Sequence, residues 1–148
     1  MNAKLVLALV AGLTLVGCDS IDPNSPVGKR KAIFKEMMST SENLGGMLRG
    51  RVPFDADAFI KGAAHLDTLS HEPWQYFEHL DESQKSSAKP ELWAQQARFD
   101  ELAREMEAAS AALVEAAKVA PLRPSGLREP VQRMEDACES CHKEFRAY

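Results

Sequence analysis

Apolar residues recur every three or four positions along most of this chain, and prolines divide the pattern into four segments. The segments cover about residues 27–50, 56–70, 90–120 and 130 to the C-terminus. A period near 3.6 residues predicts amphipathic α-helices, and no stretch has the alternation that predicts a strand. Helices with one apolar face must bury it against each other. The expected fold is therefore all-α: an antiparallel four-helix bundle over residues 27–148, with a three-helix core and a loose first helix as the alternative.

Local signals define the boundary between the first two helices. Pro53 ends the first segment, and Asp55 is a good N-cap for the second. Phe54 and Phe59 flank this cap with the spacing of a hydrophobic staple. Residues 71–89 combine aromatic side chains with a polar run, which predicts a loop with an aromatic anchor.

Prolines also delimit the two later helices. Pro90 is suited to the first turn of a helix that runs to about Ala120. The prolines and glycine in residues 121–126 are expected to stop it, and Pro130 is expected to open the last helix. The apolar stripe of that last helix has the spacing 3-4-3-4 and comprises Val131, Met134, Cys138, Cys141 and Phe145.

The first 17 residues have the pattern of an export signal. Lys4 is followed by an uncharged apolar run over residues 5–16, which is shorter than the about 20 residues of a spanning helix. The run ends Leu-Val-Gly-Cys at residues 15–18, which resembles the bacterial lipoprotein signal. That resemblance implies cleavage before Cys18 and attachment of lipid to its sulfur. An ordinary signal peptide cut nearby is the alternative.

The residues after Cys18 are expected to form a flexible tether, residues 18–26, because they are rich in proline and small polar side chains. Asp19 directly follows the cysteine, and an aspartate there resembles an inner-membrane retention signal. The expected location is the periplasmic side of a bacterial membrane, with the membrane contacted through the lipid anchor.

Composition limits the function classes. The chain has 148 residues, a formal net charge of -4, 45% hydrophobic residues and 27% charged residues. These values are ordinary for one globular domain and exclude a disordered or multispanning chain. The negative charge gives no reason to expect nucleic-acid binding. Three cysteines cannot all pair within one chain, so their positions matter more than their number.

Two of the cysteines form a CxxCH motif with Cys138, Cys141 and His142. On a helix both sulfurs fall on one side, so they can add to the two vinyl groups of one haem, and the histidine can bind its iron. The export signal matches the compartment in which such haem is attached. A zinc site, a dithiol redox pair and a structural disulfide are the alternatives.

A CxxCH on the last of four helices resembles the class II c-type cytochromes, the cytochrome c-prime family, whereas class I members carry it near the N-terminus. The segments that carry the resemblance are residues 29–37, residues 89–93 with Phe99, and residues 137–146. The resemblance implies one covalently bound haem c inside a left-handed four-helix bundle. Many members of the family are homodimers.

The resemblance also assigns residues around the haem. It implies that Arg30 lies near the propionates and that Phe34 faces the iron opposite His142. Phenylalanine has no lone pair to donate, so five-coordinate, high-spin iron is expected. Met37 lies one turn beyond Phe34; it is expected in the core, with iron ligation after a shift in register as the alternative. Arg146 is expected near the proximal imidazole, or else as an exposed cation at the helix end.

Three hypotheses of function can be compared on these residues. The first is single-electron transfer to or from a redox partner protein of unknown identity. The second is binding of nitric oxide or carbon monoxide at an open iron position. An enzyme such as a peroxidase is not expected, because peroxide cleavage needs a polar acid–base group and the predicted distal face offers Phe34 and methionines. His65 is a further, weaker candidate for a distal ligand.

Overall fold

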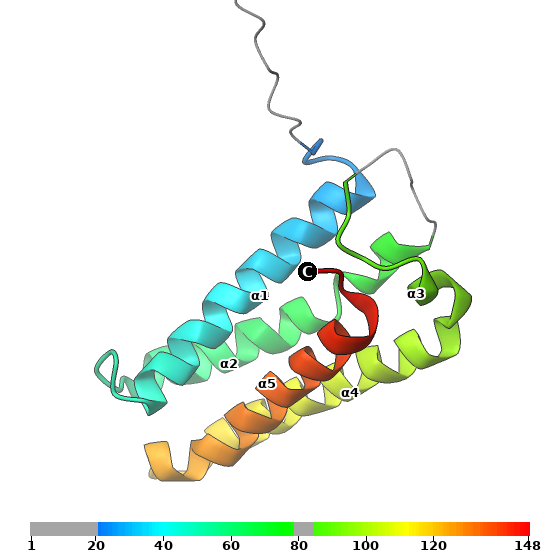
Figure 1. Cartoon of the computed structure of the whole chain (residues 1–148). Coiled ribbons are helices and arrows are strands. Elements are labelled where there is room, and N and C mark those ends of the chain that lie inside the picture. The colour runs from blue at the N-terminus through cyan, green and yellow to red at the C-terminus, as the bar shows by residue number, and fades with distance from the viewer. Residues whose placement is uncertain (1–20, 79–84) are drawn as a thin grey trace, which may run out of the picture.

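The computed structural model describes residues 21–78 and 85–148, which are helical apart from their connections and one isolated bridge between Ala88 and Arg146 (Figure 1). The described helices are α1 (Pro26–Leu48), α2 (Ala56–Ser70), the short 3-10 helix η1 (Trp74–Phe77), α3 (Glu91–Ala94), α4 (Gln96–Ala117) and α5 (Pro124–Phe145). The all-α prediction is confirmed. No helix in these two ranges is both long and apolar enough to cross a bilayer.

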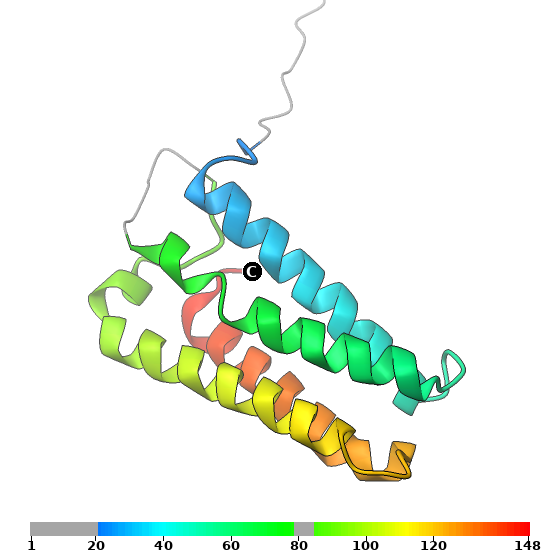
Figure 2. The same cartoon turned by 180° about the vertical axis from the view of Figure 1, so that it is seen from behind.

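The four long helices form an antiparallel bundle, as predicted. α1 packs against α2 and α5, and α4 packs against the same two helices, which closes a ring of four. Successive long helices run in opposite directions in both views (Figures 1 and 2). Because α1 is part of this ring, the alternative with a loose first helix is wrong. One end of the bundle brings together the start of α1, η1, α3, the start of α4 and the end of α5 (Figure 1).

The core consists of two adjoining clusters of buried side chains. The larger one fills the ring of four helices and includes Phe59, Leu66, Leu113 and Met134, each with an exposed fraction of 0%. Burying one such side chain stabilises the fold by about 1.5–3 kcal/mol relative to leaving it in water. The smaller cluster lies at the end that holds η1 and α3; it comprises Phe77, Leu92, Phe99, Leu102 and Phe145.

A hydrogen-bonded turn begins α1. Ser25 is the N-cap, and its Oγ accepts from the Gly28 backbone N–H at 3.0 Å. The same Oγ donates to the Asp22 carbonyl at 2.7 Å. A Cβ on Gly28 would lie 2.1 Å from that carbonyl oxygen, so the turn requires glycine there. This turn includes residues 22–26 of the segment expected to be a tether, whereas Cys18 and residues 1–17 lie outside the described residues.

The start of α2 agrees with its local signals. Asp55 is the N-cap, and its Oδ1 accepts from the Ala58 backbone N–H at 2.9 Å. The rings of Phe54 and Phe59 lie 5.8 Å apart across this cap. The expected N-cap and hydrophobic staple are both confirmed.

The third predicted helix is interrupted, which corrects the expectation of one helix over residues 90–120. Gln95 has non-helical backbone angles (φ -121°, ψ 44°) and separates α3 from α4. Leu92 is buried, and the Trp93 Nε1–H donates to the Phe77 carbonyl at 2.8 Å. These tertiary contacts hold α3 against η1, and they outweigh the local preference for one continuous helix. The helix also ends at Ala117, where Ala120 was expected.

The start of α5 also differs from the prediction. The helix begins at Pro124 and contains Pro130, which was expected to open it. Pro124 takes the first helical position, where its missing N–H costs nothing. Leu127 is buried one turn before Val131, so the apolar stripe extends further upstream than expected. Burial of this added turn compensates for the single intrahelical hydrogen bond that Pro130 cannot make.

Candidate cofactor site

The CxxCH motif lies in the last turns of α5, and its two cysteines border the interior of the bundle. The Cys138 Sγ lies 3.6 Å from the Met106 Sδ and 3.9 Å from the Met134 Sδ, on the side of the larger core cluster. Cys141, one turn later, packs against the smaller cluster. Both are free thiols. The two sulfurs thus lie one turn apart on one helix, and each borders one of the two adjoining core clusters, an arrangement that suits attachment to a single planar group.

Both cysteines are neutral thiols at physiological pH. Burial raises the pKa of Cys138 to about 11, and burial likewise raises the pKa of Cys141 to about 11. A reactive dithiol pair has the opposite property, a lowered thiol pKa. The raised thiol pKa values argue against a redox dithiol pair. A neutral S–H group is the form that adds across a vinyl double bond.

His142 follows directly on α5 and is half-buried. Burial lowers the pKa of its imidazole, and the positive charge of Arg146 lowers it further. The neutral ring, which has a lone pair for a metal, is therefore favoured. Among the described residues, no three His, Cys, Asp or Glu side chains gather as a zinc site would require.

Aromatic rings fill the interior next to Cys141. The ring centroid of Phe99 lies 5.0 Å from Phe77, 5.8 Å from Trp74 and 5.9 Å from Phe145. We call the full set the aromatic cluster: Phe34, Trp74, Phe77, Trp93, Phe99 and Phe145. The expected aromatic anchor of residues 71–89 is thus η1, which supplies two of these rings. The two thiols can attach haem, and the neutral imidazole can bind its iron. The surrounding aromatic side chains provide the apolar lining that fits haem.

Phe34 belongs to the aromatic cluster, whereas Met37 does not. The Phe34 ring lies 6.0 Å from Trp74 and 6.2 Å from Phe77, in edge-to-face arrangements. Met37, one turn further along α1, is buried in the larger core cluster. The structure therefore brings Phe34 to the end of the bundle that holds the CxxCH motif and places Met37 in the packed core.

Arg30 lies at the same end and is 4% exposed. Its Nη1 donates to the Tyr76 carbonyl at 2.7 Å, and its Nη2 donates to the Ser86 Oγ at 2.8 Å. The guanidinium also lies 4.4 Å from the centre of the Phe77 ring. In this structure Arg30 holds η1 and the segment before α3 against α1, and its contact with haem propionates stays a prediction.

The remaining candidates lie at the margins of the site. Arg146 ends α5, and its backbone N–H donates to the His142 carbonyl at 3.1 Å. Its guanidinium lies over the Tyr148 ring at 5.6 Å, so stacking on the imidazole stays a prediction. His65 is exposed between α1 and α2, with its Nε2 2.7 Å from the Glu36 Oε1, and does not lie among these residues.

Two further contacts at this end could not be found from the motif. The Lys89 Nζ donates to the Lys143 and Glu144 carbonyls at 3.2 Å and 3.1 Å, which satisfies the open C-terminus of α5. The Trp74 Nε1–H donates to the Glu107 Oε1 at 2.8 Å. The sequence does not predict the Lys89 contact, because the position of this lysine directly before Pro90 does not indicate that the end of α5 lies nearby.

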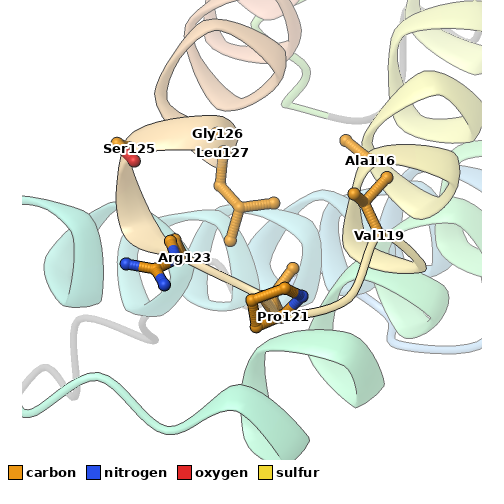
Figure 3. A pocket seen from close by; sticks show the side chains of 8 residues that line it. Ala116, Val119, Pro121, Arg123, Ser125, Gly126 and Leu127 are labelled. Carbon is orange, nitrogen blue, oxygen red and sulfur yellow. The ribbon is translucent and has the colours of Figure 1, made fainter.

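A separate cavity of about 260 Å³ lies at the opposite end of the bundle, between the end of α4 and the start of α5 (Figure 3). Its lining is mostly apolar, and Arg123 is its charged side chain. It contains none of the candidate residues, so it plays no part in the site built around the CxxCH motif.

Comparison with known proteins identifies this arrangement. Residues 25–146 match the family profile described as cytochrome c′. The chain belongs to the cytochrome c′ family. Cytochrome c′ from Rhodopseudomonas palustris is 29% identical over 146 residues, which cover 97% of each chain.

Solved cytochrome c′ structures have the same fold. The protein from Shewanella frigidimarina matches with a TM-score of 0.79 and 25% identity, over 86% of this chain and 98% of that one. A nitric oxide complex of a cytochrome c′ variant from Alcaligenes xylosoxidans matches with a TM-score of 0.74 and 24% identity, over 84% of this chain and 98% of that one.

Family membership confirms the resemblance predicted from the sequence. Cytochrome c′ proteins carry a covalently attached haem c, and this chain is a haem protein of that family. Haem c as the family's cofactor favours haem attachment over zinc, a redox dithiol or a structural disulfide as the interpretation of the CxxCH motif.

Proposed function

We propose that this chain is a periplasmic electron-transfer protein that holds haem c through Cys138 and Cys141 and binds its iron through His142. The observation that carries the proposal is the pair of half-buried, neutral thiols one turn apart on α5, with Cys138 against the larger core cluster and Cys141 against the aromatic cluster. When bound, haem supplies an iron that moves between two oxidation states. The chain supplies attachment, orientation and a surround of low polarity.

The residues of this chain support that role through burial. Phe99 and Phe145 are 2% and 4% exposed, so the interior beside Cys141 excludes water. A dry surround disfavours the added positive charge of oxidised iron, and a neutral His142 offers its lone pair without first losing a proton. These groups set the potential at which an electron enters and leaves.

Phe34 favours a second candidate function, the binding of nitric oxide or carbon monoxide. Its ring cannot donate a lone pair, and it lies in the aromatic cluster while Met37 is packed in the core. An iron bound by the protein through His142 alone would have a free position. A protein of the same fold from Alcaligenes xylosoxidans has been studied as a nitric oxide complex.

We infer that the chain is not an enzyme. The rings in contact with Phe34 in the described part of the chain are Trp74 and Phe77. Neither side chain is an acid or base at neutral pH, whereas peroxide cleavage needs such a group on the distal face. Because the two rings that contact Phe34 are neither acids nor bases, electron transfer and gas binding are the two functions to separate.

The optical spectrum of the purified ferrous protein, with and without carbon monoxide, tests the iron's coordination. We expect a five-coordinate, high-spin spectrum that changes when the gas is added. A sharp low-spin spectrum that the gas leaves unmoved would overturn the open position. Met37→Leu would then identify the ligand, because the spectrum should become high-spin only if Met37 binds iron.

We also propose that Cys18 anchors the protein to the bacterial membrane, the inner membrane being favoured by Asp19. The partners are then a redox protein of unknown identity, the membrane through the lipid and, as in many members of the family, a second copy of the chain. Growth with labelled palmitate should label the natural protein and leave Cys18→Ser unlabelled. Absence of label from both would remove the anchor.

A further inference from the structure

Polar contacts join the end of α2 to α4 beside the aromatic cluster. The Trp74 Nε1–H donates to the Glu107 Oε1 at 2.8 Å. The His71 Nδ1 lies 3.4 Å from the same oxygen. The side chain of Glu107 is 27% exposed, so this carboxylate is largely enclosed by its neighbours. A hydrogen bond to a charged acceptor in such a position is stronger than one between neutral groups.

The backbone that carries Glu107 is fixed by a second set of contacts one turn along α4. Ser110 and Ser70 are both 0% exposed, and their Oγ atoms lie 3.0 Å apart. The Ser110 Oγ also donates to the Asp67 Oδ1 at 2.8 Å. These buried contacts hold α2 and α4 together just before the chain leaves α2 for Trp74. Glu107 is thus a fixed acceptor, and Trp74 is the group that it orients.

Trp74 in turn determines how Phe34 is packed. The Trp74 ring lies 6.0 Å from Phe34 at an interplanar angle of 64°, and 5.8 Å from Phe99. Its helix, η1, has four residues and no side-chain cap, so the local backbone constrains the indole weakly. The hydrogen bond to Glu107 is the polar contact that fixes its orientation.

We propose that Glu107 is a positioning residue that controls access of small gas molecules to the iron by holding Trp74 against Phe34. The inference rests on the second candidate function, gas binding, with Phe34 facing the open position of the iron as the family resemblance implies. A gas molecule can reach that position only if the Phe34 ring moves aside. With Trp74 fixed by Glu107, the indole stays against the Phe34 ring, with 6.0 Å between the ring centroids, and opposes movement of Phe34 toward η1. Without the hydrogen bond, the indole can shift and Phe34 can follow.

The test measures the association rate of carbon monoxide with the ferrous holoprotein after flash photolysis. Glu107→Leu removes the acceptor and is expected to raise the rate about tenfold, the factor that corresponds to loss of one hydrogen bond to a charged group. Glu107→Gln keeps an acceptor oxygen and should stay near the natural rate. Trp74→Phe keeps a ring without the N–H and should resemble Glu107→Leu, and combining the two changes should add nothing further.

A matched control separates this effect from the loss of a negative charge on α4. Glu115 is exposed, lies two turns further along the helix and pairs with Lys118. Glu115→Leu removes the same charge without touching Trp74, and it should leave the association rate unchanged. An equal acceleration in Glu115→Leu and Glu107→Leu would overturn the positioning role.

The indole N–H resonances in the ferrous carbon monoxide complex provide a readout that does not depend on ligand access. The chain has two tryptophans, and the Trp93 Nε1–H donates to the backbone carbonyl of Phe77, not to a carboxylate. In Glu107→Leu, the Trp74 resonance should shift while the Trp93 resonance stays in place. In Glu107→Gln, the shift should be much smaller. An unmoved Trp74 resonance in Glu107→Leu would overturn the inference.

Phe34→Ala distinguishes failure of the inference from failure of the proposed function. If Phe34→Ala speeds carbon monoxide association and Glu107→Leu does not, Phe34 covers the iron but Glu107 does not position it. If Phe34→Ala leaves the rate unchanged, the proposed role of Phe34 itself is wrong. Acceleration by Phe34→Ala, Glu107→Leu and Trp74→Phe, with rescue by Glu107→Gln, supports both.

Discussion

Phe99→Ala is the substitution that should most directly weaken the aromatic cluster. Phe99 is 2% exposed and is the ring on which the cluster converges. Its centroid lies 5.0 Å from Phe77, 5.8 Å from Trp74 and 5.9 Å from Phe145. These neighbours belong to η1 and α5, so one side chain on α4 connects three parts of the bundle. Removing it leaves a void where those parts meet.

The expected loss of unfolding free energy follows from the burial of Phe99 and from its ring contacts. Truncating a buried phenylalanine to alanine costs about 3–5 kcal/mol, since the lost transfer energy and the cavity both count. The fixed, aromatic neighbours of Phe99 leave little room for collapse, so we expect the upper half of that range. Phe99→Leu keeps apolar contact but loses the edge-to-face ring interactions, and it should cost about 1–2 kcal/mol. Domains of this kind have a total stability of about 5–15 kcal/mol.

Urea unfolding of the holoprotein, followed by far-ultraviolet circular dichroism, measures both variants. The midpoints should fall in the order natural chain, Phe99→Leu, Phe99→Ala, with the slope unchanged. Val119→Ala is a suitable control, because Val119 is 66% exposed and its truncation should leave the midpoint within error. A loss below about 1 kcal/mol for Phe99→Ala would refute the view that these rings form a packed core.

Three further outcomes can be measured on the same protein. Ser25→Ala removes the N-cap of α1 and should cost about 1 kcal/mol of unfolding free energy in urea, while Gly28→Ala should cost more, because its Cβ would meet the Asp22 carbonyl at 2.1 Å. Met37→Leu should leave the ferrous optical spectrum unchanged, since Met37 is packed in the larger core cluster; a changed spin state would contradict this. Cys138→Ser should reduce the haem retained on a denaturing gel, and full retention would mean that this thiol is not an attachment point.

The parts of the fold that follow from local chemistry were predictable from the sequence. A 3.6-residue period gives helices, and Asp55 gives the start of α2, because both signals act within a few residues. Two of the errors, at the middle of the third predicted helix and at the start of the last one, have a common cause. At Gln95 and Pro130 the local signal competes with burial of Leu92 and Leu127, and which effect prevails depends on a partner surface far away in the sequence.

The candidate site likewise has a part that could be predicted from the sequence and a part that could not. The sequence predicts the roles of Cys138, Cys141 and His142, because their chemistry depends on spacing within about one helical turn. The bond from Trp74 to Glu107 spans 33 positions, and those from Arg30 span 46 and 56. No periodicity or motif predicts such pairs, so the contacts that orient the site become visible only when the bundle is assembled.

These long-range contacts involve residues of the connection that precede α3. Tyr76 and Ser86 accept hydrogen bonds from Arg30 on α1, whereas Lys89 donates to the last carbonyls of α5. The connection between α2 and α4 therefore touches both the helix that carries Phe34 and the helix that carries the CxxCH motif. We expect a displacement on one side of the site to reach the other through these contacts as well as through the packed helices. The least patterned part of the sequence is thus the part in which small changes should alter the iron's surroundings while leaving the bundle intact.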